Sequence, residues 1–446
     1  MDVRVSAGGR RVIRRHPAAP PAVLWITRTL EEAGFETWAV GGAVRDVLLG
    51  VDSVDWDFTT RARPEQVRRA FRRTVPIGIE HGTVGVLARD GTMYEVTTFR
   101  RDVETRGRHA TVEFTDRLEE DLARRDFTIN AVAWHPLRDE LHDPFGGVED
   151  LERGVLRTVG RPADRFAEDY LRVQRALRFA GRFELTVDPP TWTALCRATD
   201  QLGILSPERI REELIKVLAL DPRPGGALSL YAASGVLAAL LPELEPLISR
   251  RARAAPVDDW TYALLAGEAL PERRPLLRLV ALLQAAGARA AAQLLVRLRF
   301  SNAQADAVAA LVAAGTGPPS PRARPAELRR WLARVGPQRL TDLARIWCAQ
   351  ERVERSLGVG VPVDAAGSWR ALRHELRRRP ALALADLAVT GNDLIRSGLK
   401  PGPRFGRILD GLLDRVLEDP ALNRRETLLE LASTLAGDAE RPRPGS

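Results

Sequence analysis

The chain has 446 residues, of which 45% are hydrophobic and 28% charged, and its formal net charge is +8. This length exceeds what one hydrophobic core usually spans, so two to four domains are expected, and the composition excludes a fibrous or disordered protein. Cys196 and Cys348 are the only cysteines; far apart in sequence, they offer no disulfide framework and no thiolate metal site, which favours the cytoplasm. No stretch resembles a secretory signal or a membrane span, so no membrane association is expected.

The basic surplus consists almost entirely of arginine, because Lys216 and Lys400 are the only lysines among 67 basic residues. Such a surplus is typical of a protein that binds a polyanion, but a GC-rich genome produces the same skew without functional meaning. Both explanations stay open until motifs decide between them. A P-loop is excluded, since neither lysine has the required glycine before it and serine or threonine after it.

The first 150 residues or so alternate short β-branched runs with turns and helical patterns. Residues 37–40, 82–87 and 93–99 have the composition of strands, which predicts a small mixed α/β domain. From about Asp164 onward, leucine, alanine and arginine recur at helical spacing and strand signals nearly vanish. The glycine- and proline-rich residues 315–321 are the clearest breaker within this part. An α/β domain followed by several all-helical ones is therefore expected.

Two aspartates in residues 54–59 are the first candidates for chemistry. This stretch is predicted to be a strand, in which residues two apart project from the same face, so Asp55 and Asp57 would point the same way. Two carboxylates so close repel each other unless cations neutralise them, and hard oxygen ligands suit Mg²⁺. By itself, however, Asp-x-Asp is more often a solvated strand face or a turn.

A glycine pair lies upstream of these aspartates. Gly41 and Gly42 follow a strand and precede a helical pattern over residues 43–49, so their backbone N–H groups are well placed for triphosphate oxygens. The alternative is a glycine turn needed only to reverse the chain.

Taken together, these segments resemble a known family. Residues 41–46 (GGAVRD, which include Arg45), Leu48-Leu49-Gly50 and Asp55-Trp56-Asp57 are similar in wording and spacing to the signature of class II tRNA nucleotidyltransferases and bacterial poly(A) polymerases. The resemblance implies an α+β fold: a polymerase-β-like head with a mixed sheet, whose two aspartates bind catalytic Mg²⁺, followed by all-helical domains. The expected division is a head over residues 1–160, a neck over 161–222, a body over 223–320 and a tail over 321–446.

Further motifs in the head fit this resemblance. Residues 124–131 (RRDFTINA) resemble the family segment for ribose and triphosphate recognition, which makes Arg125, Asp126 and Asn130 candidates for nucleotide binding. Glu95, in another predicted strand, is a possible third metal ligand, or simply an exposed partner of an arginine. The polar residues 101–110 are predicted to be a flexible loop, and His142-Asp143 to be part of a structural turn.

Residues 168–179 read as one helix, which would place Asp169 and Arg172 one turn apart. Cytosine and adenine both present an amine donor beside a ring-nitrogen acceptor, so a carboxylate and a guanidinium together can select them and reject uracil and guanine. The family assigns that role to the matching acid and arginine. The alternative is an ordinary ion pair within the helix. Arg175 and Arg178 continue the series as candidates for binding triphosphate or tRNA.

The sequence thus predicts an enzyme that adds C, C and A to the 3′ end of tRNA, with CTP, ATP and tRNA as substrates and no protein partner. The tail, including residues 391–403 and the apolar series from Ile408 to Leu417, resembles that of the family and would contact tRNA phosphates. Relatives that add only CC, only A or poly(A) share these motifs and stay as alternatives. A non-catalytic tRNA-binding protein is the alternative from a different class.

Overall fold

A computed structural model describes residues 11, 13, 18–53, 55–106, 109–250, 256–315, 317–359, 364–399 and 404–438. The chain forms two compact units, Met1–Glu245 and Pro246–Ser446, and the boundary between them falls inside the predicted body. No helix among the described residues is long and apolar enough to cross a membrane.

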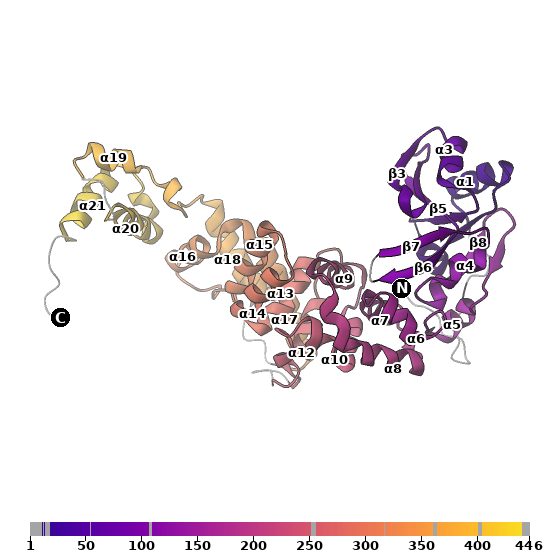
Figure 1. The fold of residues 1–446 in the computed structure, drawn as a ribbon. Coiled ribbons are helices and arrows are strands. Elements are labelled where there is room, and N and C mark those ends of the chain that lie inside the picture. Colours follow the sequence, from indigo (N-terminus) through magenta and orange to yellow (C-terminus); the bar gives the residue numbers. More distant parts are fainter. Residues whose placement is uncertain are drawn as a thin grey trace. The chain divides into compact units, whose positions relative to one another are not determined.

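A seven-stranded sheet organises the first unit, with strand order β3-β4-β5-β2-β1-β8-β9 (Figure 1). Its strands are β1 (Thr37–Val40), β2 (Asp57–Thr60), β3 (Thr74–Gly78), β4 (Thr83–Leu87), β5 (Met93–Thr98), β8 (Ala133–His135) and β9 (Glu140–His142). Because β2 and β5 run parallel whereas the other neighbours are antiparallel, the sheet is mixed, as the sequence predicted. The predicted strands at 37–40, 82–87 and 93–99 correspond to β1, β4 and β5.

The two faces of this sheet are covered differently. One face packs on α1 (Pro21–Glu32) and α3 (Pro64–Ala70), and it buries the alternate residues of β4 and β5. On the other face, α4 (Leu118–Ala123) covers β1, where Trp38 and Val40 join a core with Leu118 and Leu122. Asp57, which is paired with Val40, lies on this second face.

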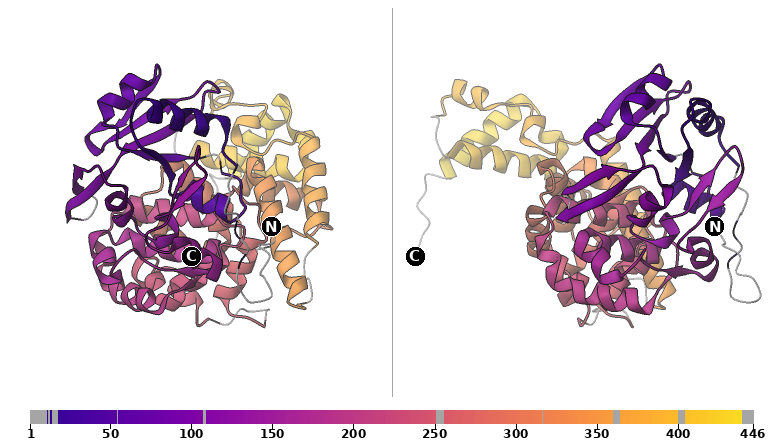
Figure 2. Two further views of the ribbon diagram at one scale, coloured as in Figure 1. Left: turned by 90° about the vertical axis from the view of Figure 1, so that its right-hand side faces the viewer. Right: turned by 45° about the vertical axis from the view of Figure 1, so that its right-hand side comes forward.

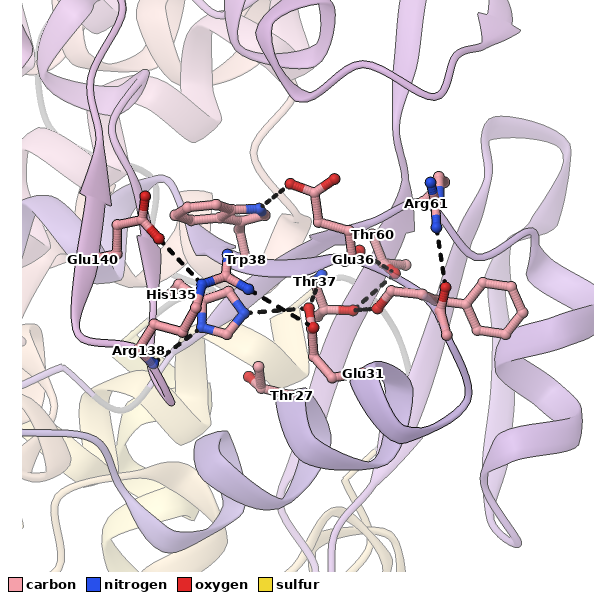
Figure 3. Close-up of polar contacts among 12 residues, drawn as sticks. Thr27, Glu31, Glu36, Thr37, Trp38, Thr60, Arg61, His135, Arg138 and Glu140 are labelled. Atoms are coloured by element: carbon pink, nitrogen blue, oxygen red, sulfur yellow. Dashed lines mark hydrogen bonds and ion pairs between the residues drawn. The ribbon is translucent and has the colours of Figure 1, made fainter.

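A polar network fixes the end of β1 that is farthest from Asp57 (Figure 3). Thr37 and Thr60 share a hydrogen bond of 2.9 Å between their hydroxyl oxygens, and the Thr37 backbone N–H donates to Glu31 Oε1 (2.8 Å). His135 on β8 reaches the same carboxylate oxygen at 3.2 Å, and burial lowers the pKa of this histidine. The network therefore ties β2, β1 and β8 to α1 at the end of β1 away from Asp57.

Of residues 101–110, predicted to be a loop, 101–106 and 109–110 instead belong to two paired strands, while Gly107 and Arg108 lie outside the described residues. Strands β6 (Arg100–Arg106) and β7 (His109–Phe114) pair antiparallel as a separate two-stranded sheet beside the main one (Figures 1 and 2). The prediction was wrong because polar composition does not exclude a ribbon: its ladder consists of backbone hydrogen bonds, which every residue except proline can donate.

Helices dominate the rest of the chain, as expected. Within the described residues beyond Asp164, the only strand is β11 (Thr186–Val187), which pairs with β10 (Val155–Leu156). The remaining helices of the first unit are α2 (Gly42–Leu48), α5 (Gly147–Arg153), α6 (Pro162–Glu168), α7 (Leu171–Arg182), α8 (Pro189–Arg197), α9 (Pro207–Leu220), α10 (Gly225–Ser234) and α11 (Val236–Leu240).

The described helices of the second unit are α12 (Asp259–Glu268), α13 (Pro275–Ala286), α14 (Ala288–Arg297), α15 (Asn302–Ala313), α16 (Pro325–Val335), α17 (Leu340–Ser356), α18 (Ala365–Arg377), α19 (Gly391–Arg396), α20 (Arg404–Glu418) and α21 (Arg425–Asp438). The predicted breaker at 315–321 lies between α15 and α16. In α20, Ile408, Leu412 and Val416 are buried against α21, which agrees with the apolar spacing of this segment.

Candidate active site

The two aspartates do not lie within one strand: Asp57 is the first residue of β2, and Asp55 precedes the strand. The strand begins at Asp57, whereas Asp55 precedes it and is exposed; Val54 lies outside the described residues. The predicted strand over residues 54–59 is therefore too long at its start. Asp57 pairs with Val40 on one side and with Glu95 on the other, so the Glu95 side chain emerges on the same face as that of Asp57.

Electrostatic crowding marks this position. Burial raises the pKa of Asp57 to about 6, and the negative charges of Asp55 and Glu95 add to the effect, while Arg125 opposes it. A cation at this position would relieve that repulsion. Among the described residues, no group of three or more His, Cys, Asp or Glu side chains is arranged to hold a metal ion. The role of Glu95 as a third metal ligand stays a prediction.

Gly41 lies directly beside the side chains of Asp57 and Arg125. Its φ of +78° is a conformation that favours glycine, and a Cβ added there would lie 3.2 Å from Arg125 Nη1 and 3.7 Å from Asp57 Oδ2. The structure thus brings Gly41, Arg125 and Asp57 together, as the motifs suggested. Gly42 begins α2 and lies next to Arg45, whose Nη2 would be 3.4 Å from an added Cβ.

Asp121, which the sequence analysis did not identify, orients Arg124 and Arg125 of residues 124–131, called the RRD segment below. It is fully buried, accepts hydrogen bonds from Arg124 Nε (3.0 Å) and Thr59 Oγ1 (3.1 Å), and lies 3.4 Å from Arg125 Nη2. These guanidinium groups keep the pKa of Asp121 below its usual value despite burial. The signal was available, because acidic and basic residues three and four apart on a helix face each other.

Four of the candidate nucleotide-binding side chains are bonded to one another in a largely buried network. Arg45 donates to Asn130 Oδ1 (2.6 Å), Asn130 Nδ2 donates to Asp126 Oδ1 (3.0 Å), and Asp126 Oδ2 pairs with Arg175 Nη2 (2.6 Å). Although burial opposes ionisation of Asp126, its contacts with Arg175 and Asn130 lower its pKa to about 2. The network joins α2 to the RRD segment and to α7.

Asp169 and Arg172 do not share one helix, contrary to the prediction. Asp169 separates α6 from α7 in an extended conformation (φ −155°, ψ 105°), and its Oδ1 accepts a hydrogen bond from the Leu171 N–H (3.1 Å). Such side chain–backbone bonds compete with helix formation, which the apolar pattern could not reveal. The two side chains have different partners: Asp169 Oδ2 pairs with Arg209 (2.7 Å) and Arg172 pairs with Glu168.

Arg178 is buried and pairs with Glu213 of α9 at 2.8 Å, a partner that sequence reasoning did not identify. The turn predicted around His142-Asp143 is structural: Asp143 accepts hydrogen bonds from the N–H groups of Gly147 and Val148, both at 2.8 Å, at the start of α5.

Comparisons with known proteins agree with this organisation. Residues 37–157 match the family model described as the poly A polymerase head domain, residues 184–248 match a probable RNA and SrmB-binding site of polymerase A, and residues 277–432 match a putative domain 2 of tRNA nucleotidyltransferases. Fold and sequence therefore define the first unit as carrying a nucleotidyltransferase head.

Individual relatives define the family more narrowly than these domain models do. The CCA-adding enzyme of Lactobacillus delbrueckii subsp. bulgaricus is 34% identical over 91% of this chain and 95% of its own length, and that of Geobacillus kaustophilus is 35% identical over 91% and 94%. A crystal structure of the Bacillus stearothermophilus CCA-adding enzyme in complex with CTP matches with a TM-score of 0.77, at 32% identity, over 95% of this chain and 99% of that one. The chain belongs to the family of CCA-adding enzymes, which confirms the resemblance seen in its motifs.

Proposed function

We propose that this protein adds C, C and A to the 3′ end of tRNA, using CTP and ATP and releasing pyrophosphate. The observation that carries the proposal is the position of the Asp57 carboxylate beside Gly41 and the Arg125 guanidinium, with the Asp55 carboxylate near enough to raise the pKa of Asp57. Family membership supports the same reaction, because the relatives named above are CCA-adding enzymes. The reaction belongs in the cytoplasm, where Cys196 and Cys348 stay free thiols.

Asp55 and Asp57 would hold the divalent metal, for which we propose Mg²⁺. A pair of carboxylates fits this ion, which in phosphoryl-transfer sites is bound by one or two carboxylates together with substrate phosphates. When bound, the metal supplies charge neutralisation at the reacting phosphate and activates the attacking hydroxyl. Arg125, held by Asp121, is positioned to neutralise triphosphate oxygens, and Gly41 and Gly42 let the triphosphate approach the backbone.

The remaining candidates have two different roles. Arg45, Asp126, Asn130, Arg175 and Arg178, the other candidates for nucleotide binding, hold the head motifs and α7 in place around the nucleotide through their side-chain bonds. Asp169 and Arg172 read the incoming base, exchanging contacts with Arg209 and Glu168 for contacts with cytosine or adenine. In the same scheme, residues 1–160 catalyse transfer, 161–222 select the base, 223–320 form the body and 321–446 bind tRNA.

The test is incubation of the purified protein with Mg²⁺, tRNA that lacks its CCA end, and each nucleotide in turn. We expect CTP to be added twice and ATP once, and we expect Asp55→Ala to abolish incorporation while tRNA binding stays near normal. Asp169→Ala should relax the choice among the four nucleotides. CC-only, A-only or repeated A addition would identify a relative with a different specificity, and substantial turnover by Asp55→Ala would contradict the assigned chemistry.

A further inference from the structure

Asp57 lies on a face of the sheet that is covered by a helix on the β1 side of this residue and is open on the β5 side. Toward β1 and β8, α4 packs over the sheet. Toward β5, β4 and β3, a row of directly paired residues continues from Asp57 to Glu95, then Gly85, then Val75. Directly paired residues project from the same face, so the row extends the catalytic face to the edge of the sheet, where β3 lies (Figure 1).

Beyond Glu95 and the paired Thr83 and Thr97, this open part of the face is apolar, whereas water-facing strands usually carry polar side chains. Val75, Ile77 and Met93 are 43%, 41% and 48% exposed, respectively. Ile77 and Met93 meet above Gly85, since a Cβ on this glycine would lie 2.6 Å from Ile77 Cδ1 and 3.0 Å from Met93 Sδ. We call Val75, Ile77, Gly85 and Met93 the apolar platform. Clustered exposed apolar side chains of this kind mark binding surfaces.

The direction of the proposed reaction indicates what covers the platform. In phosphoryl transfer, the attacking and leaving oxygens lie roughly in line on opposite sides of phosphorus. The groups suited to the leaving pyrophosphate, Gly41 and Arg125, lie on the β1 side of Asp57. The attacking 3′-hydroxyl of the primer therefore approaches from the side of Glu95, and the nucleotides behind it extend over β4 and β3.

Distances are compatible with this path. Neighbouring strands lie about 4.8 Å apart, so Gly85, two strands away, is about 10 Å from Asp57. Stacked nucleotides rise by about 3.4 Å each, so about three nucleotides cover that span.

We propose that the apolar platform holds the last unpaired nucleotides of the tRNA primer through contacts with their bases. This inference rests on the proposed function and deepens it. An apolar surface suits a primer whose end changes with every addition, because contacts with the face of a base tolerate any sequence. Methionine adapts readily to differently shaped partners, which suits Met93 to this task. The platform positions the primer without taking part in nucleotide selection.

The experiment measures steady-state kinetics of the double variant Ile77→Ala/Met93→Ala. We expect the KM for tRNA to rise about tenfold at each of the three additions, while the KM for CTP changes less than twofold. Leu137→Ala, which removes a 38% exposed leucine from the turn between β8 and β9, is the matched control and should leave both constants unchanged. An unchanged KM for tRNA in the double variant, or an equal rise in the KM for CTP, would overturn the inference.

Two further measurements separate this idea from misfolding and from the proposed function itself. The conservative Ile77→Val/Met93→Leu variant should restore most of the affinity for tRNA, which simple loss of side-chain function predicts and misfolding does not. A photoreactive amino acid in place of Val75 should crosslink to the terminal nucleotides of tRNA; crosslinking to a second copy of the chain, or to distant parts of tRNA, would refute the assignment. If wild-type protein adds no nucleotide at all, the proposed function fails, whereas an active wild type with an unaffected double variant defeats only the platform.

Discussion

Arginine side chains serve the two units of this protein in different ways. In the second unit, Arg329 of α16 is 5% exposed; its Nε donates to the Leu417 carbonyl (2.7 Å), its Nη2 to the Glu418 carbonyl (2.9 Å), and its Nη1 pairs with Glu375 (2.9 Å). One side chain thereby satisfies the last carbonyls of α20 and joins it to α18. In the first unit, Arg45 and Arg175 instead end a chain of side-chain bonds that passes through the RRD segment.

The difference lies in what each arrangement connects. Arg329 binds the end of a helix within a packed helical region, so losing it should cost stability and little else. The network around Asp126 joins the helix that follows Gly41 to α7, and Arg125 precedes Asp126 directly. A change in that network should therefore affect the geometry around Asp57 as well as the stability of the fold.

The largest expected effect comes from Asp57→Asn. Removing one of the carboxylates that would hold the metal should lower the rate of nucleotide addition by at least about a thousandfold, since such charge stabilisation is worth several kcal/mol. The melting temperature should not fall, because burial and repulsion already disfavour the ionised form of Asp57. Single-turnover kinetics and thermal unfolding measure both. A destabilised variant would mean that Asp57 holds the fold together, as Arg329 does.

Arg329→Leu should cost about 3 kcal/mol of unfolding free energy, because it leaves the buried Glu375 without its closest partner. Chemical denaturation followed by the fluorescence of Trp331 and Trp347, which contact each other in this unit, reports the loss. The neighbouring Arg330, whose partners Asp414 and Glu418 are exposed, provides the matched control: Arg330→Leu should change stability only slightly. CTP affinity should stay the same in both variants, and a clear drop would show that the second unit influences the site.

Asp126→Asn should destabilise the protein by about 2 kcal/mol at neutral pH and should also slow nucleotide addition. The folded-state pKa of about 2 lies below the ordinary 3.8, so the ionised Asp126 contributes its stability fully above pH 4. That contribution is lost as the pH falls toward 2. The difference in melting temperature between wild type and variant should therefore shrink between pH 5 and pH 3. The exposed Asp116→Asn should show a much smaller difference, and a constant gap across this range would contradict the assigned ionisation.

The sequence predicted most of what depends on local patterns. Strands β1, β4 and β5, the helix after Gly41 and the change to an all-helical chain all follow from periodicity and turn residues. It failed at Asp169, where a polar side chain interrupts a helical pattern. It also failed at residues 101–106 and 109–110, which form strands despite their polarity. It also could not reveal how far each arginine is buried, because Arg125 stays partly exposed beside its local partner Asp121, whereas Arg178 is buried against the tertiary partner Glu213.

The smallest expected effect concerns the far end of β1. Thr37→Val removes the buried hydroxyl that bonds to Thr60 and to the Phe35 carbonyl, and the loss of these two hydrogen bonds should cost about 1–2 kcal/mol. Because the backbone pairs from Thr37–Thr60 to Val40–Asp57 remain, the position of Asp57 should be preserved and turnover should stay within about twofold of wild type. Thermal unfolding and the rate of CTP addition measure the two quantities. If turnover falls far more than stability, the network around Thr37 also sets the register of β2 at Asp57. The residues that hold the fold and the residues that shape the site would then not be separate within the sheet.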